Sequence, residues 1–448
     1  MTKNLTKTQI FLLVVIFWCI ALSSNPLNFS LNSLKVSIES SGVINAAINS
    51  DLEITWGGID MDSGNDIALD TSGNIYITGH TESFGEGSDD AFIAKFDSTG
   101  NSLLNITWGG SDSDSGNAIT VDTSGNIYIT GHTESFGEGS DDAFIAKYDS
   151  TGNSLLNITW GGNDSDSGND IALDSSGNIY ITGTTESFGA GIHDVFIAKY
   201  DSAGNSLLNI TWGGNDWDYG LGITLDTAGN IYTTGFTESF GAGIADAFVA
   251  KYDNVGNSLL NITWGGINND HGLRITLDAS GNIYITGNTY SFGAGTYDVF
   301  LAKYDSLGNS LLNITWGGSD WDYGRDIVLD ALGNIYITGS TESFGAGTYD
   351  VFLVKYDSLG NSLLNITWGG SEWDFGNGIA LDASDNVYIT GGTENFGMGG
   401  RDAFIVKYDM TDTKTDDSTP GISGYNLFFL LSILSVVVFT ISKKLKKS

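Results

Sequence analysis

Three observations predict an all-β fold, a seven-bladed β-propeller of 52-residue repeats closed by an N-terminal strand. One tryptophan recurs every 52 residues, at Trp56, Trp108, Trp160, Trp212, Trp264, Trp316 and Trp368. Each interval contains four short runs rich in Ile, Tyr, Phe and Thr, which favour strands, and no run with helical periodicity. Proline, which removes a donor from a strand ladder, is absent between residues 51 and 414. A fixed period with four antiparallel strands per copy is typical of a propeller.

The turns of each copy have a physical explanation of their own. In the first copy the strand-like runs cover residues 67–70, 75–78, 91–96 and 102–108. The junctions 70–74 and 97–101 place Asp before the turn and Gly at the left-handed position, which predicts tight hairpins. In the seventh copy Asp385 replaces that glycine. The junction 81–90 is longer and glycine-rich, so it predicts a loop.

Closure of the ring follows from the two ends of the repeat array. Residues 52–58 have the sequence of a fourth strand with no blade in front of them. The last copy ends at Asp409, after its third strand. We therefore expect the N-terminal strand to complete the seventh blade and remove an open sheet edge.

The repeated residues resemble the SBBP-type β-propeller repeat. Its signature is a Gly-Gly pair, an Asp-x-x-Gly-Asn-x-Tyr-x-Thr-Gly hairpin and an Asp-Ala-Phe-x-Ala-Lys-x-Asp strand. In the first copy these stand at 57–58, 70–79 and 90–97, and the resemblance extends over roughly residues 51–410. It implies the propeller architecture and says almost nothing about activity.

The N-terminal segment predicts export. Lys3 and Lys7 precede an apolar run at residues 10–22, and the small residues Ser23 and Ser24 follow it. This order is that of a secretory signal peptide, and an uncleaved N-terminal anchor is the alternative.

The C-terminal segment predicts a membrane anchor. Residues 422–441 are an apolar stretch long enough to span a bilayer, and four lysines follow it. Because such a lysine cluster stays in the cytoplasm, the body of the chain is expected outside. Pro420 and Gly421 before this helix resemble the archaeal PGF-CTERM type of sorting signal, with Ile422 where that family has Phe.

These signals give the domain organisation and the location. We expect a cell-surface protein anchored in the membrane by its C-terminal helix. The expected parts are a signal peptide (1–24), an N-terminal linker (25–50), the propeller (51–410), a polar linker (411–421), a transmembrane helix (422–441) and a basic cytoplasmic tail (442–448).

Charge and motifs exclude several function classes. The 448-residue chain has 54 acidic and 18 basic residues, a formal net charge of −36, so we expect no binding to nucleic acid. The four histidines form no Ser-His-Asp or Cys-His grouping, and no phosphate-binding loop occurs. The carboxylates lie at turn positions common to all copies and do not form one asymmetric catalytic pair. We therefore expect a non-enzymatic protein without a required cofactor.

Candidate ligand-binding residues lie in the connections between blades. Small residues stand beside the carboxylates in the first three copies, apart from Met61, whereas later copies have aromatic residues and one histidine. The candidates are Trp217, Tyr219, His271, Trp321, Tyr323, Trp373 and Phe375. Exposed aromatic side chains stack on sugars or anchor a protein partner. Alternatively, they pack against the neighbouring loops that carry Tyr297 and Tyr349.

The same connections suggest a calcium site. Alternating carboxylates before a glycine resemble the start of a calcium loop, although the distant bidentate Glu of an EF-hand is missing. The candidate ligands are Asp60, Asp62, Asp112, Asp114, Asp164 and Asp166. Capping of a tight turn by Asp is the competing interpretation.

Three further sets of residues repeat around the ring. Asn-Ile-Thr sequons on the predicted outer strands are candidate glycosylation sites: Asn105, Asn157, Asn209, Asn261, Asn313 and Asn365. The seven tryptophans are expected to pack between neighbouring blades. Lys95 and its six equivalents are expected to pair with a local carboxylate.

Two functions of different classes remain open. One is a binding or adhesion module that recognises extracellular carbohydrate or protein through the aromatic residues. The other is a structural component of the cell envelope. A calcium-binding propeller and a glycan-active enzyme are minor alternatives.

Overall fold

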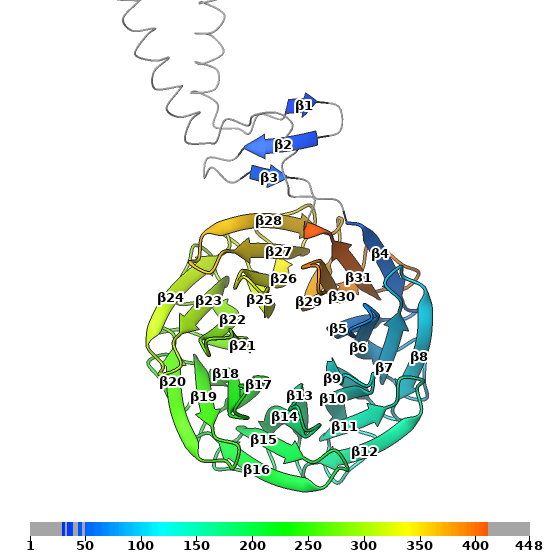
Figure 1. Cartoon of the computed structure of the whole chain (residues 1–448), viewed down its shortest axis with the longest axis vertical. Coiled ribbons are helices and arrows are strands. Elements are labelled where there is room, and N and C mark those ends of the chain that lie inside the picture. Colours follow the sequence, from blue (N-terminus) through cyan, green and yellow to red (C-terminus); the bar gives the residue numbers. More distant parts are fainter. Residues whose placement is uncertain (1–28, 32–33, 39–43, 47–49, 411–448) are drawn as a thin grey trace, which may run out of the picture. The chain divides into compact units, whose positions relative to one another are not determined.

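The computed structural model describes residues 29–31, 34–38, 44–46 and 50–410. Residues 50–410 form seven four-stranded antiparallel sheets arranged in a ring, the predicted seven-bladed propeller (Figure 1). The predicted signal peptide, polar linker, transmembrane helix and basic tail lie outside the described residues. Among the described residues, none belongs to a helix with the length and apolar character needed to cross a membrane.

Each blade runs outward from its first strand, which lies nearest the axis, to its last, which forms the rim (Figure 1). Blade one consists of β5 (Asp62–Leu69), β6 (Ile75–Thr81), β7 (Asp90–Phe96) and β8 (Ser102–Trp108). Blade two consists of β9 (Asp114–Val121), β10 (Ile127–Thr133), β11 (Asp142–Tyr148) and β12 (Ser154–Trp160). Blade three consists of β13 (Asp166–Leu173), β14 (Ile179–Thr185), β15 (Asp194–Tyr200) and β16 (Ser206–Trp212).

The remaining blades repeat this arrangement. Blade four consists of β17 (Asp218–Leu225), β18 (Ile231–Thr237), β19 (Asp246–Tyr252) and β20 (Ser258–Trp264). Blade five consists of β21 (Asp270–Leu277), β22 (Ile283–Thr289), β23 (Asp298–Tyr304) and β24 (Ser310–Trp316). Blade six consists of β25 (Asp322–Leu329), β26 (Ile335–Thr341), β27 (Asp350–Tyr356) and β28 (Ser362–Trp368). Blade seven consists of β29 (Asp374–Leu381), β30 (Val387–Thr393), β31 (Asp402–Tyr408) and β4 (Leu52–Trp56).

The composition of blade seven confirms the predicted closure. Strand β4, from the N-terminal side of the array, pairs antiparallel with β31, with Trp56 opposite Ala403 and Leu52 opposite Lys407. The last blade thereby gains its fourth strand from the start of the array, and β31 has no open edge. The segment 25–50, which we expected to be a linker, contains a three-stranded sheet of β1 (Phe29–Leu31), β2 (Leu34–Ile38) and β3 (Ile44–Ala46).

The hairpin turns have the predicted chemistry. The N–H of Gly73 donates to the carbonyl of Asp70 (2.9 Å), and the Asp70 carboxylate accepts from the N–H of Ser72 (2.8 Å). Gly73 has a φ of 79°, in the left-handed region that favours glycine. In blade seven Asp385 has this conformation with a φ of 62° and is the one non-glycine residue with positive φ in the described part of the chain.

The core lies between adjacent blades, as predicted for the repeated tryptophans. Trp160 of blade two stacks on Phe196 of blade three, with ring centroids 3.8 Å apart. Its indole N–H donates to the side-chain oxygen of Asn209 on the rim of blade three (3.1 Å). The same Trp–Phe contact occurs at all seven junctions, at 3.8–4.4 Å. Each tryptophan therefore joins two blades.

The repeated lysines do not make the ion pairs that we expected. The ammonium group of Lys95 lies 4.8 Å from the ring centroid of Tyr76, and all seven copies repeat this contact at 4.6–5.3 Å. The two residues are opposite each other on β7 and β6, which places the cation over the ring. The carboxylate of Asp70 accepts instead from the Tyr76 hydroxyl (2.9 Å). The expectation of a lysine–carboxylate pair was therefore wrong.

Every innermost strand contains a β-bulge, which the sequence analysis did not predict. In β5 the pairing register shifts between Gly64 and Asp66, so Asn65 has no partner on β6. The seven bulge residues are Asn65, Asn117, Asn169, Leu221, Leu273, Arg325 and Asn377. All seven line a pocket between the innermost strands.

Candidate functional site

The blade-to-blade connections and the loops between second and third strands lie at one end of the ring, and we call this end the loop face. Backbone hydrogen bonds join the two kinds of loop across blades. For example, the N–H of Asp114 in blade two donates to the carbonyl of Asp89 in blade one (2.9 Å). The loop face is therefore a connected surface whose side chains keep fixed spacings.

The second carboxylate residue of each blade-to-blade connection, Asp62 in blade one, holds the loops of this face together through hydrogen bonds. Asp62 is fully buried, and its Oδ2 atom accepts from the N–H of Gly58 (2.8 Å) and the hydroxyl of Ser83 (2.7 Å). The hydroxyl of Thr81 donates to its Oδ1 atom. Asp62 thus fixes the Gly-Gly turn and the neighbouring loop, which is the geometry of a turn-capping residue.

The structure separates the two carboxylates of each proposed calcium pair. Asp60, Asp112 and Asp164 are exposed, whereas Asp62, Asp114 and Asp166 are fully buried. Like Asp62, Asp114 and Asp166 accept a backbone N–H from the preceding Gly-Gly pair, at 2.8 Å in each case. Within the described part of the chain, no group of three or more His, Cys, Asp or Glu side chains has an arrangement that could hold a metal ion.

The candidate tryptophans stand on the loop face with a large part of their rings exposed. Trp217, Trp321 and Trp373 are 43%, 44% and 43% exposed. Each lies edge-on to a ring from the loop of the preceding blade: Trp217 to His193 (5.3 Å), Trp321 to Tyr297 (6.2 Å) and Trp373 to Tyr349 (5.8 Å). Each tryptophan ring packs on a neighbouring loop and is still partly exposed to solvent. The geometry therefore agrees in part with both interpretations of the sequence, ligand binding and packing against the loops.

A second row of rings connects these tryptophans into one surface. Tyr219, Tyr323 and Phe375 each stand two residues after a tryptophan, and His271 holds the equivalent place in blade five. Successive rings lie 4.2–6.5 Å apart in the order Tyr219, Phe236, His271, Tyr297, Tyr323, Tyr349 and Phe375. These spacings are those of interacting aromatic pairs. We call the two rows together the aromatic arc.

The aromatic arc covers blades four to seven only. At the places of Tyr219 and its equivalents, blades one to three have Ser63, Ser115 and Ser167. Burial lowers the pKa of His271 and raises that of Tyr323 to about 12, so both rings are uncharged at neutral pH. The arc is therefore a neutral, partly apolar strip on a strongly acidic chain.

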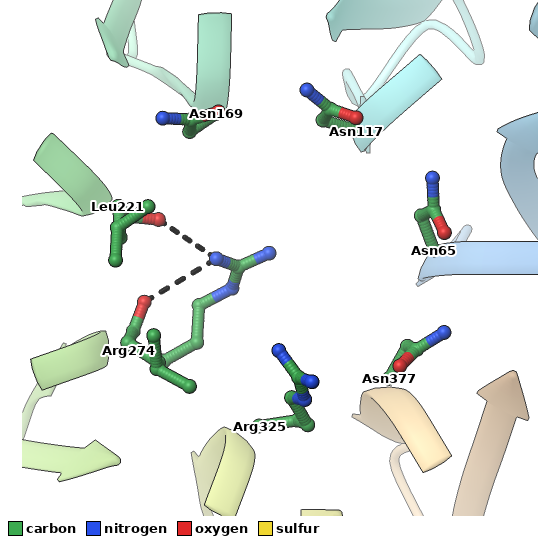
Figure 2. Close-up of a pocket in the computed structure, with 8 residues that line it drawn as sticks. Asn65, Asn117, Asn169, Leu221, Arg274, Arg325 and Asn377 are labelled. Atoms are coloured by element: carbon green, nitrogen blue, oxygen red, sulfur yellow. Dashed lines mark hydrogen bonds between the residues drawn. The ribbon is translucent and has the colours of Figure 1, made fainter. Parts of the chain in front are cut away.

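A polar pocket of about 260 Å³ lies where the innermost strands approach the axis. Figure 2 shows its bulge residues and Arg274 arranged around one space. Four of the bulge residues are asparagines, and each donates an amide N–H to a glycine carbonyl of the next blade at 2.8–3.0 Å. We did not predict this pocket from the sequence. One signal in the sequence could have revealed it: the residue that follows Gly64 and its equivalents differs between copies.

A cluster of charges lies beside this pocket. Arg274 donates to the carbonyl of Leu221 (2.7 Å), and its Nε atom lies 3.8 Å from the carboxylate of Asp326. Asp66 and Asp170 interact electrostatically with the same arginine. Burial raises the pKa of Asp66 to about 8 and that of Asp326 to about 6, against the opposing effect of Arg274.

The candidate glycosylation sites lie on the rim. Five of the six sequon asparagines are exposed, and Asn365 is half-buried. Several of them already accept an indole N–H from the preceding blade, as Asn105 does from Trp56 (2.9 Å). In blade seven, Glu53 replaces the asparagine and accepts from Trp368 (3.2 Å).

A comparison with protein families identifies the repeats. The model of the SBBP β-propeller repeat matches residues 57–84, 97–136, 152–188 and 314–344. These four segments match the SBBP β-propeller repeat. In these repeats the matched segments cover the Gly-Gly turns, hairpins and rim strands described above.

Comparisons with individual proteins agree with the fold. The chain is 23% identical to regulatory protein FlaEY of Caulobacter vibrioides over 51% of its length and 30% of that protein. It is 23% identical to an uncharacterized WD repeat-containing protein of Acanthamoeba polyphaga mimivirus, over 81% of its length and 34% of that protein. The chain thus spans about a third of each of these relatives. Among solved structures, the WD40 β-propeller domain of Doa1 is similar, with a TM-score of 0.51 and 11% identity, over 80% of this chain and 96% of that one.

Proposed function

We propose that this SBBP-repeat propeller is a non-enzymatic binding module that recognises carbohydrate through the aromatic arc. The observation that carries the proposal is the exposure of Trp217, Trp321 and Trp373, at 43–44% each, on a face held rigid by buried aspartates. Exposed indole and phenol rings on a rigid scaffold stack on the apolar faces of sugars and lose little conformational entropy in doing so. A protein partner that inserts side chains between the rings is the alternative ligand.

The proposal includes a location. The apolar stretch at 422–441 and the lysines after it favour a membrane anchor with the propeller outside the cell. At such a location the exposed sequon asparagines of the rim are accessible to glycosylation enzymes. The loop face is then free to meet extracellular ligands.

A structural role in the cell envelope is the second candidate. Its support is the row of five exposed sequon asparagines, which would make the rim a glycosylated, hydrated surface. This role does not require the aromatic arc, so the two functions are separable by mutation.

A glycan array tests the binding function. The purified full-length chain should bind a limited set of glycans, and a variant with Trp217→Ser, Trp321→Ser and Trp373→Ser should lose that binding. The matched control is Leu307→Thr with Leu359→Thr, which copies the threonines of blades one and two at turns on the opposite face and should bind normally. Equal binding by the tryptophan variant would refute recognition by the arc.

A further inference from the structure

The arginines of this chain are concentrated at one place. The whole sequence contains three, Arg274, Arg325 and Arg401, and they belong to blades five, six and seven. The seven other basic residues of the propeller are the repeated lysines over tyrosine rings. The arginines are therefore the basic residues that break the repeat, and they lie in or beside the aromatic arc.

Arg325 differs from the other two in its partners. Arg401 pairs with Glu394 at 2.8 Å, and Arg274 lies 3.8 Å from Asp326. No ion pair within the described residues involves Arg325, whose guanidinium lies 5.7 Å from the ring centroid of Tyr323. In a chain with three acidic residues for each basic one, this is a cation whose carboxylate partner is missing.

The surroundings of Arg325 form a built site. Arg325 is exposed to the pocket, and Asn377 and Asn65 follow it in the next two blades around the ring (Figure 2). Both asparagines are oriented by the hydrogen bonds that they donate to Gly64 (2.9 Å) and Gly116 (3.0 Å). Their amide oxygens accept no hydrogen bond from the described residues, so they can accept from ligand hydroxyl groups.

We propose that this pocket binds the carboxylate of an acidic sugar, such as a uronic acid at the end of a glycan. The guanidinium of Arg325 pairs with the carboxylate, for which its planar fork is suited, and Asn377 and Asn65 accept from the sugar hydroxyls. Tyr323 connects this pocket to the aromatic arc, so the rest of the glycan lies along the rings. The inference rests on the proposed carbohydrate function and specifies its ligand class.

Size and charge restrict the ligand to one such sugar. The pocket, about 260 Å³, is smaller than the roughly 300–1,000 Å³ of pockets that hold drug-sized ligands, so it fits a single monosaccharide unit. The net charge of −36 repels a polyanion. The carboxylates beside the pocket, those of Asp66 and Asp326, interact with Arg274, so Arg325 remains to pair with a single ligand carboxylate.

Calorimetric titration with D-glucuronate and D-glucose tests the proposal. The purified full-length chain should bind glucuronate more tightly than glucose, and Arg325→Asn should weaken glucuronate binding by about tenfold or more, as loss of a charged hydrogen bond implies. Glucose binding should not change. Asparagine is the residue of blades one, two, three and seven at this place, so the variant should fold. Arg325→Leu, which copies Leu221 and Leu273, is the second variant if it does not.

Lys147→Gln serves as the charge-matched control, because it removes one positive charge outside the pocket and should leave glucuronate binding unchanged. Equal glucuronate affinity in the wild-type and Arg325→Asn chains would overturn the proposal. So would competition by acetate as strong as that by glucuronate, or Arg325-dependent binding of an acidic peptide with no binding of glucuronate. If the glycan array shows tryptophan-dependent binding of neutral glycans that Arg325→Asn does not affect, the arc retains its function and only the acidic-sugar assignment fails.

Discussion

Blades one to three and blades four to seven have one backbone and two different loop faces. Both groups have the same inter-blade tryptophans, the same turn-capping aspartates and the same hairpins. On the loop face the first group presents Ser63 and its equivalents, and the second presents the aromatic arc. Because the first group folds without aromatic residues at these positions, the fold does not require them. The residues that are candidates for a function beyond folding therefore lie in blades four to seven.

The opposite end of the ring shows a related difference. Val255, Leu307 and Leu359 are 69%, 78% and 77% exposed at turn positions where blades one and two have Thr99 and Thr151. Divergence between copies therefore occurs at both ends and at the bulges of the innermost strands, whereas the rim strands of blades one to six have the same sequence.

The largest expected effect comes from opening the ring that holds both groups of blades. Deletion of residues 51–58 removes β4 and leaves β31 with an unpaired edge. We expect the truncated chain to aggregate or to lose its cooperative melting transition, as followed by circular dichroism and size-exclusion chromatography. A truncated chain that melts like the intact one would contradict the closure by β4.

A tryptophan common to all blades should matter more for stability than one of the arc. Trp160→Ala removes the stack on Phe196 and a hydrogen bond across a blade junction. Because the side chain is only half-buried, we expect a loss of about 3 kcal/mol, the low end of the range for a buried Trp. Chemical denaturation measures this loss, and a change below about 1 kcal/mol would mean that these stacks do not hold the blades together.

The charge cluster of the inner strands predicts a dependence of stability on pH. Because burial raises the pKa of Asp66 to about 8, the folded state binds this proton more tightly than the unfolded state does. The contribution of protonated Asp66 to the free energy of unfolding is therefore fully present below about pH 4. It is lost progressively as the pH rises from about 4 to 8. The melting temperature of the wild-type chain should decrease over this range, and Asp66→Asn should have a flatter profile. Identical pH profiles of the two chains would show that Asp66 is ionised throughout.

The smallest expected change in stability concerns the turn in which Asp385 replaces the left-handed glycine. Asp385 has a φ of 62°, where a residue with a side chain costs on the order of 1 kcal/mol more than glycine. Asp385→Gly, which restores the residue of the other six blades, should raise the free energy of unfolding by up to about that amount. A decrease in stability would indicate that the Asp385 side chain makes a contact worth more than the strain.

The sequence was sufficient for the parts of the fold that repeat. The period, the Asp–Gly hairpins and the unpaired fourth strand at residues 52–58 predicted the blades, the turns and the closure. The inter-blade position of Trp160 also followed, because a large apolar residue ending each rim strand has to find a neighbouring blade. These features depend on local patterns that occur seven times.

The features that escaped prediction depend on distances between strands. The first two strands of blade one lie so close beside the bulge that a Cβ atom on Gly79 of β6 would stand 1.8 Å from the carbonyl oxygen of Ser63 on β5. No single-strand pattern reveals such crowding or the bulge beside it, so the pocket with Arg325 was missed. The contact of Lys95 with Tyr76 likewise depends on the register between two strands.

We infer that the aromatic arc serves recognition and is not needed for the fold. The most direct measurement is the melting temperature of the chain with Trp217→Ser, Trp321→Ser and Trp373→Ser. Each ring is 43–44% exposed, so each change should cost less than about 1 kcal/mol, and the melting temperature should stay within a few degrees of the wild-type value. A cooperative transition at nearly the same temperature supports the account. A collapse of stability would show that the rings are structural, and the comparison between the two groups of blades would lose its functional meaning.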